Sequence, residues 1–513
     1  MKKVHFLLIA ILFATCVFAE NDNDFISNFV TTDGTRFVDN KGRTLILNGV
    51  NYVNKNGILS ENDELVFKDF KKYGYNVIRF GIIWDRLEHE PGKMDKSYLE
   101  DIDKRVEWAR ENGIYLMFDF HQDLYGSKWG DGAPLWATLD DNLPHAVGEI
   151  WSDSYFLSPA INQAFDNFWN NRRAQDGIGI QDHYLNMLKV VARRYAKSPS
   201  VIGIDIFNEP YGGTLSREVP TLLLKSVMGF LPDSIKKDHF DFNSLREEKN
   251  MTIVLNLLEN KDTYKTIISS CADVANNFER NQLSGFYQKA RNVMRSAGFD
   301  KIIFLEHNYF GNLGMRSDFA LPKDEKGQTD LRCVYSPHGY DIITDTPMAF
   351  DDNSARVDAI FEMIEQNGAH KHTPVMLGEW GAYYNSPAAY DAANHIARII
   401  ESKKLSQTYW SHDDNLYKLA YFHTAISRAF PRAVNGTLIS YKNMPETKDF
   451  EMKWEECNHA KTIIYHPFVS NVNVSLFPKS HYKISRIPDS NAGYVIIDAC
   501  KNKARRSIRI AQK

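Results

Sequence analysis

The chain has 513 residues, of which 43% are hydrophobic and 25% charged, and its formal net charge is −4. This length exceeds one average domain, so we expect one large domain followed by a smaller one. The low net charge excludes strong electrostatic attraction to nucleic acid or to an anionic surface. Aromatic residues make up 13% of the chain, which suits a carbohydrate cleft and a large core equally.

The N-terminus has the pattern of a secretory signal peptide. Lys2 and Lys3 precede an apolar run over 6–18, and Val17 and Ala19 are small residues at the spacing that signal peptidase requires. We predict cleavage after Ala19 and a secreted protein, in the extracellular fluid or in an acidic digestive, lysosome-like compartment. A membrane anchor is the alternative, but the run is short for a span. No later segment is predicted to cross a membrane.

Four cysteines remain after this cleavage, and an even number in a secreted chain predicts two disulfides. We expect Cys457 to pair with Cys500, because both lie in the predicted C-terminal domain; four free buried thiols are the alternative. The other two cysteines are Cys271 and Cys333. Three sequons make the chain a candidate glycoprotein, and they begin at Asn250, Asn435 and Asn473.

Eight short apolar, β-branched runs alternate with stretches of helical periodicity. This alternation predicts parallel strands in an α/β fold, and eight such units predict a (β/α)8 TIM barrel with its active site at the C-terminal ends of the strands. The strands are expected at 45–51, 75–81, 113–119, 200–207, 301–306, 332–337, 374–379 and 404–411. The clearest helical stretches are 98–112, 180–196, 283–297, 355–366 and 388–403.

Helical periodicity stops after Pro431, where short alternating runs separated by Pro, Gly and Asn predict a small C-terminal β-sandwich. We therefore divide the chain into a signal peptide over 1–19, a barrel domain over 20–430 and a β-sandwich over 431–513. The role of the β-sandwich stays open: it is either structural or orients the enzyme at a lipid surface.

Carboxylates stand at the ends of two predicted strands, where a core strand needs none. Glu209 ends strand four and Glu379 ends strand seven, so the two can face each other across the barrel mouth. Glycoside cleavage needs such a pair, one protonated to serve the leaving oxygen and one ionised to attack. Retention of configuration needs them about 5 Å apart, and mutual repulsion helps to keep one protonated. We predict Glu209 as acid/base and Glu379 as nucleophile.

Other polar and aromatic residues at the strand ends suit this chemistry. Arg79 can hold the nucleophile ionised, and Tyr340 can donate to it. His338 can support the acid, Asn208 can bond the 2-hydroxyl of the sugar, and Trp410 offers a flat surface for the sugar ring. Each residue alone is more often structural, but their joint occurrence in this order argues against that alternative.

These residues resemble the eight-residue pattern of the cellulase-like glycoside hydrolase family five, of clan A. The pattern is Arg, His, Asn-Glu, His-x-Tyr, Glu and Trp. Here it is occupied by Arg79, His121, Asn208, Glu209, His338, Tyr340, Glu379 and Trp410. The resemblance implies a retaining, double-displacement mechanism with Glu209 as acid/base and Glu379 as nucleophile.

Further stretches resemble endoglycoceramidases within that family, which release the whole glycan of a glycosphingolipid and leave ceramide. They are 49–55, 118–126, 130–137, 207–213 and 431–437. The resemblance implies a glycosphingolipid substrate on a membrane or micelle surface, and a first sugar bound by Lys55, His121 and Asp123. Glucosylceramidases and steryl-glucosidases resemble the same stretches, so an exo-acting enzyme stays open, as does an endo-glucanase or mannanase.

A ceramide leaving group would need an apolar pocket beyond the scissile bond. Two long excursions, 124–179 and 211–298, lie on the active-site side, and the second contains the apolar stretch 219–231 directly after the acid/base strand. We expect this stretch to line or cap a lipid groove, or to dip into a membrane surface; an ordinary helix packed on the barrel is the alternative. The side chains concerned are Leu222, Leu223, Leu224, Val227 and Phe230.

No cofactor, metal or nucleic acid is predicted. The histidines are dispersed without HExxH or CxxC spacing, and no glycine-rich phosphate loop precedes a helix. His121 and Asp123 resemble a metal-binding pair, but the sequence suggests no third ligand, so sugar hydroxyls explain them better. A catalytically inactive binding protein is the rival class, and the presence of both carboxylates with all their partners disfavours it. The oligomeric state stays open.

Overall fold

The computed structural model describes residues 29–233, 248–346, 354–500 and 504–513. The predicted signal peptide lies outside these residues. Within them, no helix combines the length and the apolar character that crossing a membrane requires.

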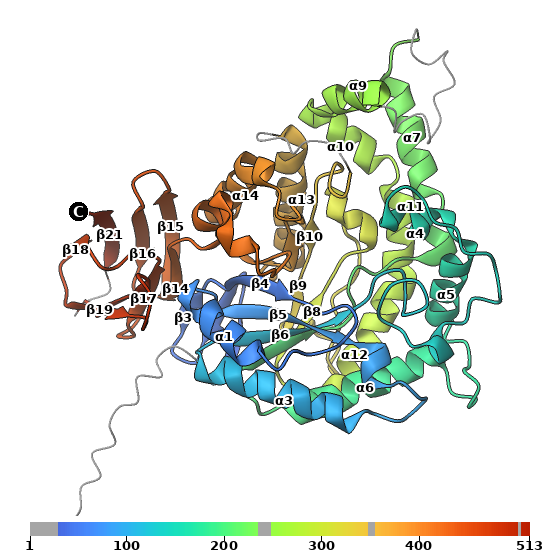
Figure 1. Cartoon of the computed structure of the whole chain (residues 1–513), viewed down its shortest axis with the longest axis horizontal. Helices are drawn as coiled ribbons and strands as arrows, with labels where there is room; N and C mark the ends of the chain where they lie inside the picture. The colour runs from blue at the N-terminus through green and yellow to red at the C-terminus, as the bar shows by residue number, and fades with distance from the viewer. Residues whose placement is uncertain (1–28, 234–247, 347–353, 501–503) are drawn as a thin grey trace, which may run out of the picture.

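Eight parallel strands form the barrel in the predicted chain order (Figure 1). Neighbouring strands pair in the order β11-β13-β4-β5-β6-β7-β8-β9, and a bridge between Tyr335 and Val375 joins the two ends of this sheet. The (β/α)8 fold class is therefore confirmed. The strands are β4 (Asn48–Tyr52), β5 (Val77–Ile83), β6 (Tyr115–His121), β7 (Val201–Asp205), β8 (Ile302–Leu305), β9 (Cys333–Tyr335), β11 (Met376–Leu377) and β13 (Ser406–Tyr409).

The barrel strands are buried on both faces, as helix-covered parallel strands are. Every residue of β5 and of β6 is buried, including Arg79 within β5 and His121 at the C-terminal end of β6. Two short strands, β10 (His338–Gly339) and β12 (Glu379–Trp380), continue β9 and β11 at the barrel mouth and place His338 beside Glu379 in register.

Helices surround the barrel where the apolar periodicity predicts them. The helix α3 begins where the Asp95 side chain accepts hydrogen bonds from the backbone of Ser97 and Tyr98, which satisfies free N–H groups of its first turn. The predicted helices correspond to α3 (Lys96–Glu111), α6 (Ile180–Tyr195), α12 (Ser284–Ser296), α13 (Ala355–Lys371) and α14 (Tyr390–Lys403).

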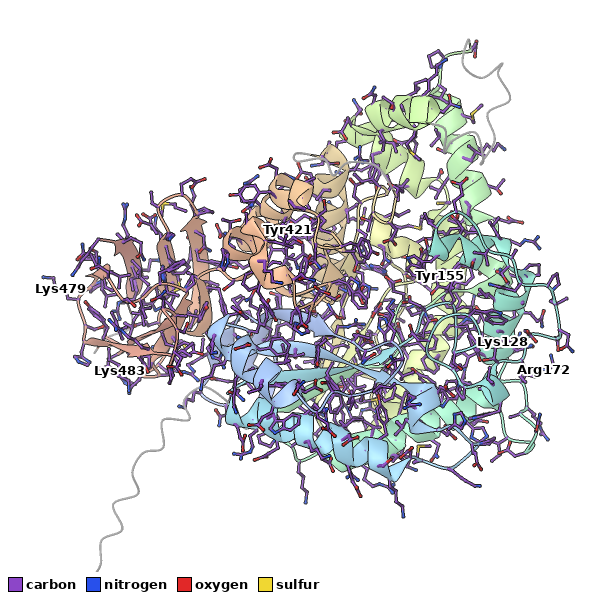
Figure 2. The ribbon with its side chains drawn as sticks, in the orientation of Figure 1. Lys128, Tyr155, Arg172, Tyr421, Lys479 and Lys483 are labelled. Carbon is purple, nitrogen blue, oxygen red and sulfur yellow. The ribbon has the colours of Figure 1, made fainter. Side chains whose placement is uncertain are left out.

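The two excursions form helical layers over the barrel mouth (Figure 1). The first contains η2 (Trp151–Asp153), α4 (Ser154–Leu157) and α5 (Pro159–Trp169). The second contains α7 (Val219–Phe230), α9 (Glu248–Leu258), α10 (Lys261–Ser269) and α11 (Ala272–Phe278). In Figure 2, Tyr155 lies inside the first excursion, whereas Lys128 and Arg172 lie at its outer surface.

The C-terminal region forms two antiparallel sheets that share an apolar core with the N-terminal end of the barrel. Their outer edge carries the exposed Lys479 and Lys483 (Figure 2). The strands from this region are β14 (Phe430–Asn435), β15 (Thr437–Met444), β16 (Asp449–Glu455), β17 (Thr462–His466), β18 (Val472–Phe477), β19 (Tyr482–Arg486), β20 (Gly493–Ile497) and β21 (Arg505–Gln512).

The structure differs from the predicted domain division at the N-terminal end. The strands β1 (Val30–Asp33), β2 (Arg36–Asp39) and β3 (Arg43–Leu45) extend the sheet that contains β14, because β3 pairs with β14 in antiparallel register. Residues 30–45 thus belong to the β-sandwich rather than to the barrel. A pairing between segments nearly 400 residues apart leaves no local pattern, so a division into contiguous segments could not foresee it.

All four cysteines are free in the described chain, so the predicted Cys457–Cys500 disulfide is not formed. The Cys457 sulfur lies 3.7 Å from Oδ1 of Asn435 and 4.0 Å from the carbonyl oxygen of Gly42 instead. Asn435 is fully buried, which excludes a glycan at this sequon in the folded chain, whereas Asn473 is exposed on β18.

Candidate active site

The two predicted catalytic carboxylates meet at a single imidazole. Nδ1 of His338 lies 2.9 Å from Oε1 of Glu209 and 3.5 Å from Oε2 of Glu379. Each glutamate has a carboxylate oxygen within 4.8 Å of the other's. The barrel therefore brings together two side chains that are 170 positions apart in the sequence.

Glu379 is oriented by two hydrogen bonds. Nη1 of Arg79 donates to its Oε1 at 2.7 Å, and the hydroxyl of Tyr340 donates to its Oε2 at 2.7 Å. Burial raises the pKa of Glu379 to about 6, and the charge of Glu209 acts in the same direction, whereas His338 and Arg79 lower it. Glu379 is therefore mostly ionised at neutral pH, as a nucleophile must be.

Arg79 is the centre of a buried charge network. Its guanidinium is fully buried and also donates to Asn51, Asp119, Asp205, Asn208 and Glu306, at 2.8–3.2 Å. Burial disfavours its charge, but the surrounding carboxylates hold the pKa of Arg79 well above its usual value. The arginine thus stays charged and fixes the positions of the groups around Glu379.

Glu209 is held by contacts on its side chain and on its backbone. Oε1 accepts hydrogen bonds from Nδ2 of Asn312 at 2.7 Å and from the imidazole of His338, and the backbone N–H donates to Oε2 of Glu306 at 2.9 Å. Its φ angle is +44°, a conformation that residues other than glycine seldom adopt. Such strain is typical of a residue whose position is determined by its surroundings.

His338 bridges the catalytic pair to a deeper carboxylate. Its Nε2 lies 3.2 Å from Oε1 of Glu306. Burial alone would lower the pKa of His338, but Glu306 and Glu379 raise it well above the usual value. The pKa of Glu306 falls to about 2, because His338 and Arg79 outweigh the effect of its own burial. Both ring nitrogens of His338 therefore face carboxylates, which favours the protonated imidazole.

The residues predicted to bind the first sugar form one cluster. The ammonium of Lys55 is hydrogen-bonded to Asp123 and lies 5.2 Å from the ring centre of Trp410 and 5.4 Å from that of Trp151. The imidazole of His121 stacks on Trp410, with ring centres 5.1 Å apart and planes 15° apart. The structure therefore brings Lys55, His121, Asp123 and Trp410 together.

Asn208 lies next to the catalytic pair, but its side chain already has partners. Oδ1 accepts from Arg79 at 2.8 Å, and Nδ2 donates to the carbonyl oxygen of Gln122 at 3.1 Å. One N–H of the amide remains for the predicted contact with a sugar hydroxyl.

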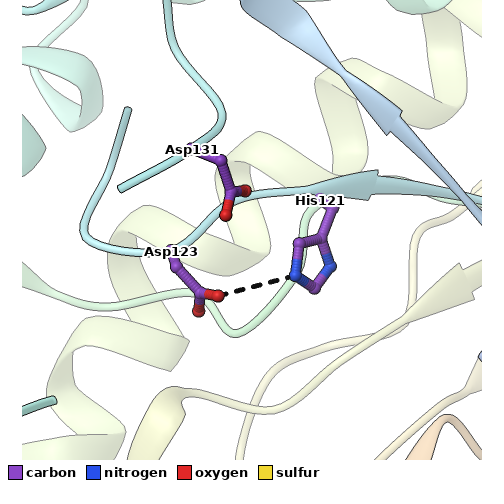
Figure 3. A group of neighbouring side chains, drawn as sticks. All are labelled: His121, Asp123 and Asp131. Carbon is purple, nitrogen blue, oxygen red and sulfur yellow. Dashed lines mark ion pairs between the residues drawn. The ribbon is translucent and has the colours of Figure 1, made fainter. Parts of the chain in front are cut away.

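A third side chain, that of Asp131, joins His121 and Asp123 (Figure 3). One nitrogen or oxygen of each side chain lies within 4.8 Å of the others, close enough for a metal ion by distance alone. The ammonium of Lys55 is already hydrogen-bonded to Asp123. Burial alone would lower the pKa of His121, but the neighbouring carboxylates raise it well above its usual value. A metal ion would have to compete with Lys55 for Asp123, so sugar binding stays the prediction for this cluster.

Several residues of the network were absent from the sequence predictions. Glu306 directly follows β8 and obeys the same rule that identified Glu209 and Glu379, so it could have been found. Asn312 lies in a loop helix without any such signal, and it is brought to Glu209 only by the fold. The others are Asn51, Asp119, Asp131 and Asp205.

One cavity of about 690 Å³ includes both catalytic carboxylates and the sugar-binding cluster. The same cavity is lined by apolar side chains of the second excursion. Of the five predicted on α7, Leu223, Leu224 and Val227 line it; Leu222 packs against the core, and Phe230 is 43% exposed outside the lining. The other apolar residues from this excursion are Pro220, Met251, Val254, Leu258, Ile267 and Ile268.

A family model and two named relatives match the sequence of this chain. A family model described as cellulase (glycosyl hydrolase family 5) matches residues 38–416. An endoglycoceramidase I from Rhodococcus hoagii is 32% identical over 192 residues, which are 36% of this chain and 37% of that protein. An endoglycoceramidase from Cyanea nozakii is 23% identical over 511 aligned residues, covering 90% of this chain and 89% of that one.

The fold also matches a solved structure, endo-glycoceramidase II from Rhodococcus sp. in complex with ganglioside GM3. The TM-score is 0.71 with 23% identity, over 94% of this chain and 100% of that chain. At this identity, the likeness establishes the shared fold.

Proposed function

We infer the reaction from one premise: the chain belongs to glycosyl hydrolase family 5, whose model matches residues 38–416. This confirms the family resemblance of its strand-end residues and makes the protein a glycoside hydrolase. We propose that it acts on glycosphingolipids, cleaving the β-glycosidic bond between glycan and ceramide and releasing both intact. The relatives named endoglycoceramidase support this choice of substrate.

The observation that carries this proposal is the extent of the cavity. A glucan-cleaving enzyme needs polar sugar sites on both sides of the cut. Here the cavity that contains Glu209 and Glu379 is also lined by apolar side chains of α7, α9 and α10. Its volume of about 690 Å³ lies in the usual range of small-ligand pockets, roughly 300–1,000 Å³. An apolar leaving group such as ceramide gains from burial there.

We propose a double displacement at the two glutamates. The carboxylate of Glu379 attacks the anomeric carbon, while the carboxyl group of Glu209 gives its proton to the ceramide oxygen, so ceramide leaves and a glycosyl ester forms. Glu209, now ionised, takes a proton from a water molecule, which attacks the same carbon and frees both the glycan and Glu379. The oxygens within 4.8 Å favour the roughly 5 Å spacing of retaining enzymes over the roughly 6.5–9.5 Å of inverting ones.

The surrounding groups give each glutamate its role. Arg79 and Tyr340 donate to Glu379 and stabilise it as an anion, both before attack and when it leaves the sugar. Asn312 donates to Oε1 of Glu209, so the proton for the leaving group is expected on Oε2. The imidazolium of His338 contacts both glutamates and offsets part of their repulsion.

We further propose that the protein is secreted. Lys2 and Lys3, the apolar run over 6–18 and the small residues Val17 and Ala19 support this location. N-terminal sequencing of the protein purified from its native host tests it, and a mature chain that still begins at residue 1 would contradict it.

Mass spectrometry of the products tests the proposed substrate. The enzyme is incubated with a ganglioside and, separately, with glucosylceramide. Intact oligosaccharide and free ceramide from the ganglioside support the proposal. Glucose from glucosylceramide alone would indicate an exo-acting glucosylceramidase, and activity on soluble glucan alone would remove the lipid from the function. Glu379→Gln is the control for contaminating hydrolases, because it removes the attacking carboxylate.

A further inference from the structure

A short hairpin returns the chain to the sugar-binding cluster after β6. Asp123 and Asp131 exchange two backbone hydrogen bonds, of 3.2 and 3.1 Å. Gly130 and Gly132 flank Asp131, and a Cβ atom on Gly130 would lie 2.3 Å from the carbonyl oxygen of Asp123. Gly132 has a φ angle of +112°, which side-chain-bearing residues rarely adopt. Both glycines are thus required for Asp131 to lie this close to Asp123.

The carboxyl group of Asp131 lies behind the residues that face the cavity. His121 and Asp123 line the cavity, whereas Asp131 is 3% exposed and is not part of the lining. Within the described chain, Oδ1 of Asp131 and Nε2 of His121 are buried without a hydrogen-bond partner. Nε2 of His121 does lie 3.6 Å from Oδ2 of Asp123, the ion pair drawn in Figure 3. A buried, unpaired carboxylate oxygen costs stability. The carboxyl group of Asp131 can reach a substrate only through its two neighbours.

Asp131 also lacks a counter-ion of its own. The charged groups that face it are Lys55, which follows β4, Asp119 and His121 on β6, and Asp123 in the hairpin. Lys55 is bonded to Asp123, and Nδ1 of His121 lies 2.8 Å from Asp119. Burial raises the pKa of Asp131 to about 7, with His121 opposing and Asp123 reinforcing this shift. The neutral form of Asp131 is therefore favoured over what an exposed aspartate would show.

We propose that Asp131 is a positioning residue that, in its neutral form, holds His121 and Asp123 in the arrangement that binds the first sugar. The neutral carboxyl group does not repel Asp123, and its O–H can donate to a neighbouring carboxylate. The ionised group repels Asp123 and attracts Lys55 and the imidazolium, which draws these donors away from the sugar. This inference rests on the proposed function, because it assumes that the cluster holds a sugar.

The consequence is a pH-dependent affinity for the sugar that is separate from the chemistry at Glu379. For wild-type enzyme and an aryl β-lactoside, we expect KM to rise about fivefold as pH increases from about 6 to about 8, since one weakened hydrogen bond has this effect. Over the same range kcat should rise no more than about twofold as Glu379 ionises. Asp131→Asn keeps the shape and the neutral state, so its KM should stay low and flat. Asp131→Ala removes the carboxyl group, so its KM should be raised at every pH.

The control is Asp140→Asn, the same change at a buried aspartate of the same excursion that pairs with Lys128. Its KM profile should match the wild type. A KM in Asp131→Asn that follows pH as the wild type does, or a loss confined to kcat, would overturn the inference. Because the aryl substrate carries no lipid, cleavage of it without cleavage of glycosphingolipids would refute the proposed substrate and leave this test of Asp131 valid.

Discussion

The guanidinium of Arg79 and the carboxylate of Glu379 share a 2.7 Å hydrogen bond in a place where Arg79 has no solvent exposure. The two residues lie 300 positions apart in the chain. Arg79 also binds three further carboxylates, those of Asp119, Asp205 and Glu306. One side chain therefore links the folding of the barrel to the ionisation of the nucleophile.

Arg79→Met should reduce both stability and turnover. It leaves buried carboxylates without their partner, which costs about 3–5 kcal/mol, and it removes a donor to the nucleophile, which lowers kcat roughly 100-fold. Urea denaturation and steady-state kinetics measure the two effects. The control is Arg105→Met, which breaks the buried pair with Asp63 and should lose stability while keeping kcat. Equal kcat losses in the two variants would contradict the role of Arg79.

The acidic limb of the pH profile should report Glu379. Its pKa is raised to about 6, and attack requires the ionised form, so activity is present above pH 6 and is lost as pH falls through it. Arg79→Met removes a charge that lowers this pKa, so the limb should move to higher pH. An aryl glycoside with a good leaving group keeps the variant measurable. A limb that stays in place would show that another group titrates.

Glu209→Ala should respond to azide if Glu209 is the acid/base. We expect kcat/KM on the lipid substrate to fall at least roughly 100-fold, while an activated aryl glycoside still forms the glycosyl ester. Azide then enters the space of the lost carboxylate and gives a β-glycosyl azide, identified by NMR. Glu379→Ala should give the α-azide. Exchanged outcomes would reverse the two assignments, and an α-azide from both would argue against retention.

The apolar lining of the cavity should matter only for lipid substrates. Leu223→Asp places a charge in the cavity, and we expect about a tenfold loss in kcat/KM on a ganglioside, with little change on an aryl lactoside. Phe230→Asp, on the same helix but 43% exposed and outside the lining, is the matched control. Equal losses on both substrates for Leu223→Asp would indicate a misfolded helix rather than a lipid site.

The four thiols should differ in reactivity. Cys457 is exposed and should be alkylated in the native protein, whereas Cys271 and Cys333 are buried, and burial raises the pKa of each to about 12. These two should react only after denaturation. Peptide mass spectrometry without reducing agent measures this. A peptide that joins Cys457 to Cys500 would show that the purified protein forms the disulfide predicted from the sequence.

The sequence predicted those features that leave a local pattern. Apolar runs and helical periodicity located the barrel strands and the helices around them, because burial of each element requires them. Polar residues at strand ends identified Glu209, Glu379 and their partners, because parallel strands bring their C-terminal ends to one face. By the same rule Glu306 could have been recognised.

Only the tertiary structure decided the features that depend on how distant segments pack. These include the pairing of β3 with β14, the contact of Asn312 with Glu209, and the return of Asp131 to His121. The structure also separated Leu223 in the cavity lining from Phe230 at the surface, although both belong to one apolar helix. A sequence pattern shows which residues avoid water. Which residues they then contact depends on how the assembled barrel and its excursions pack.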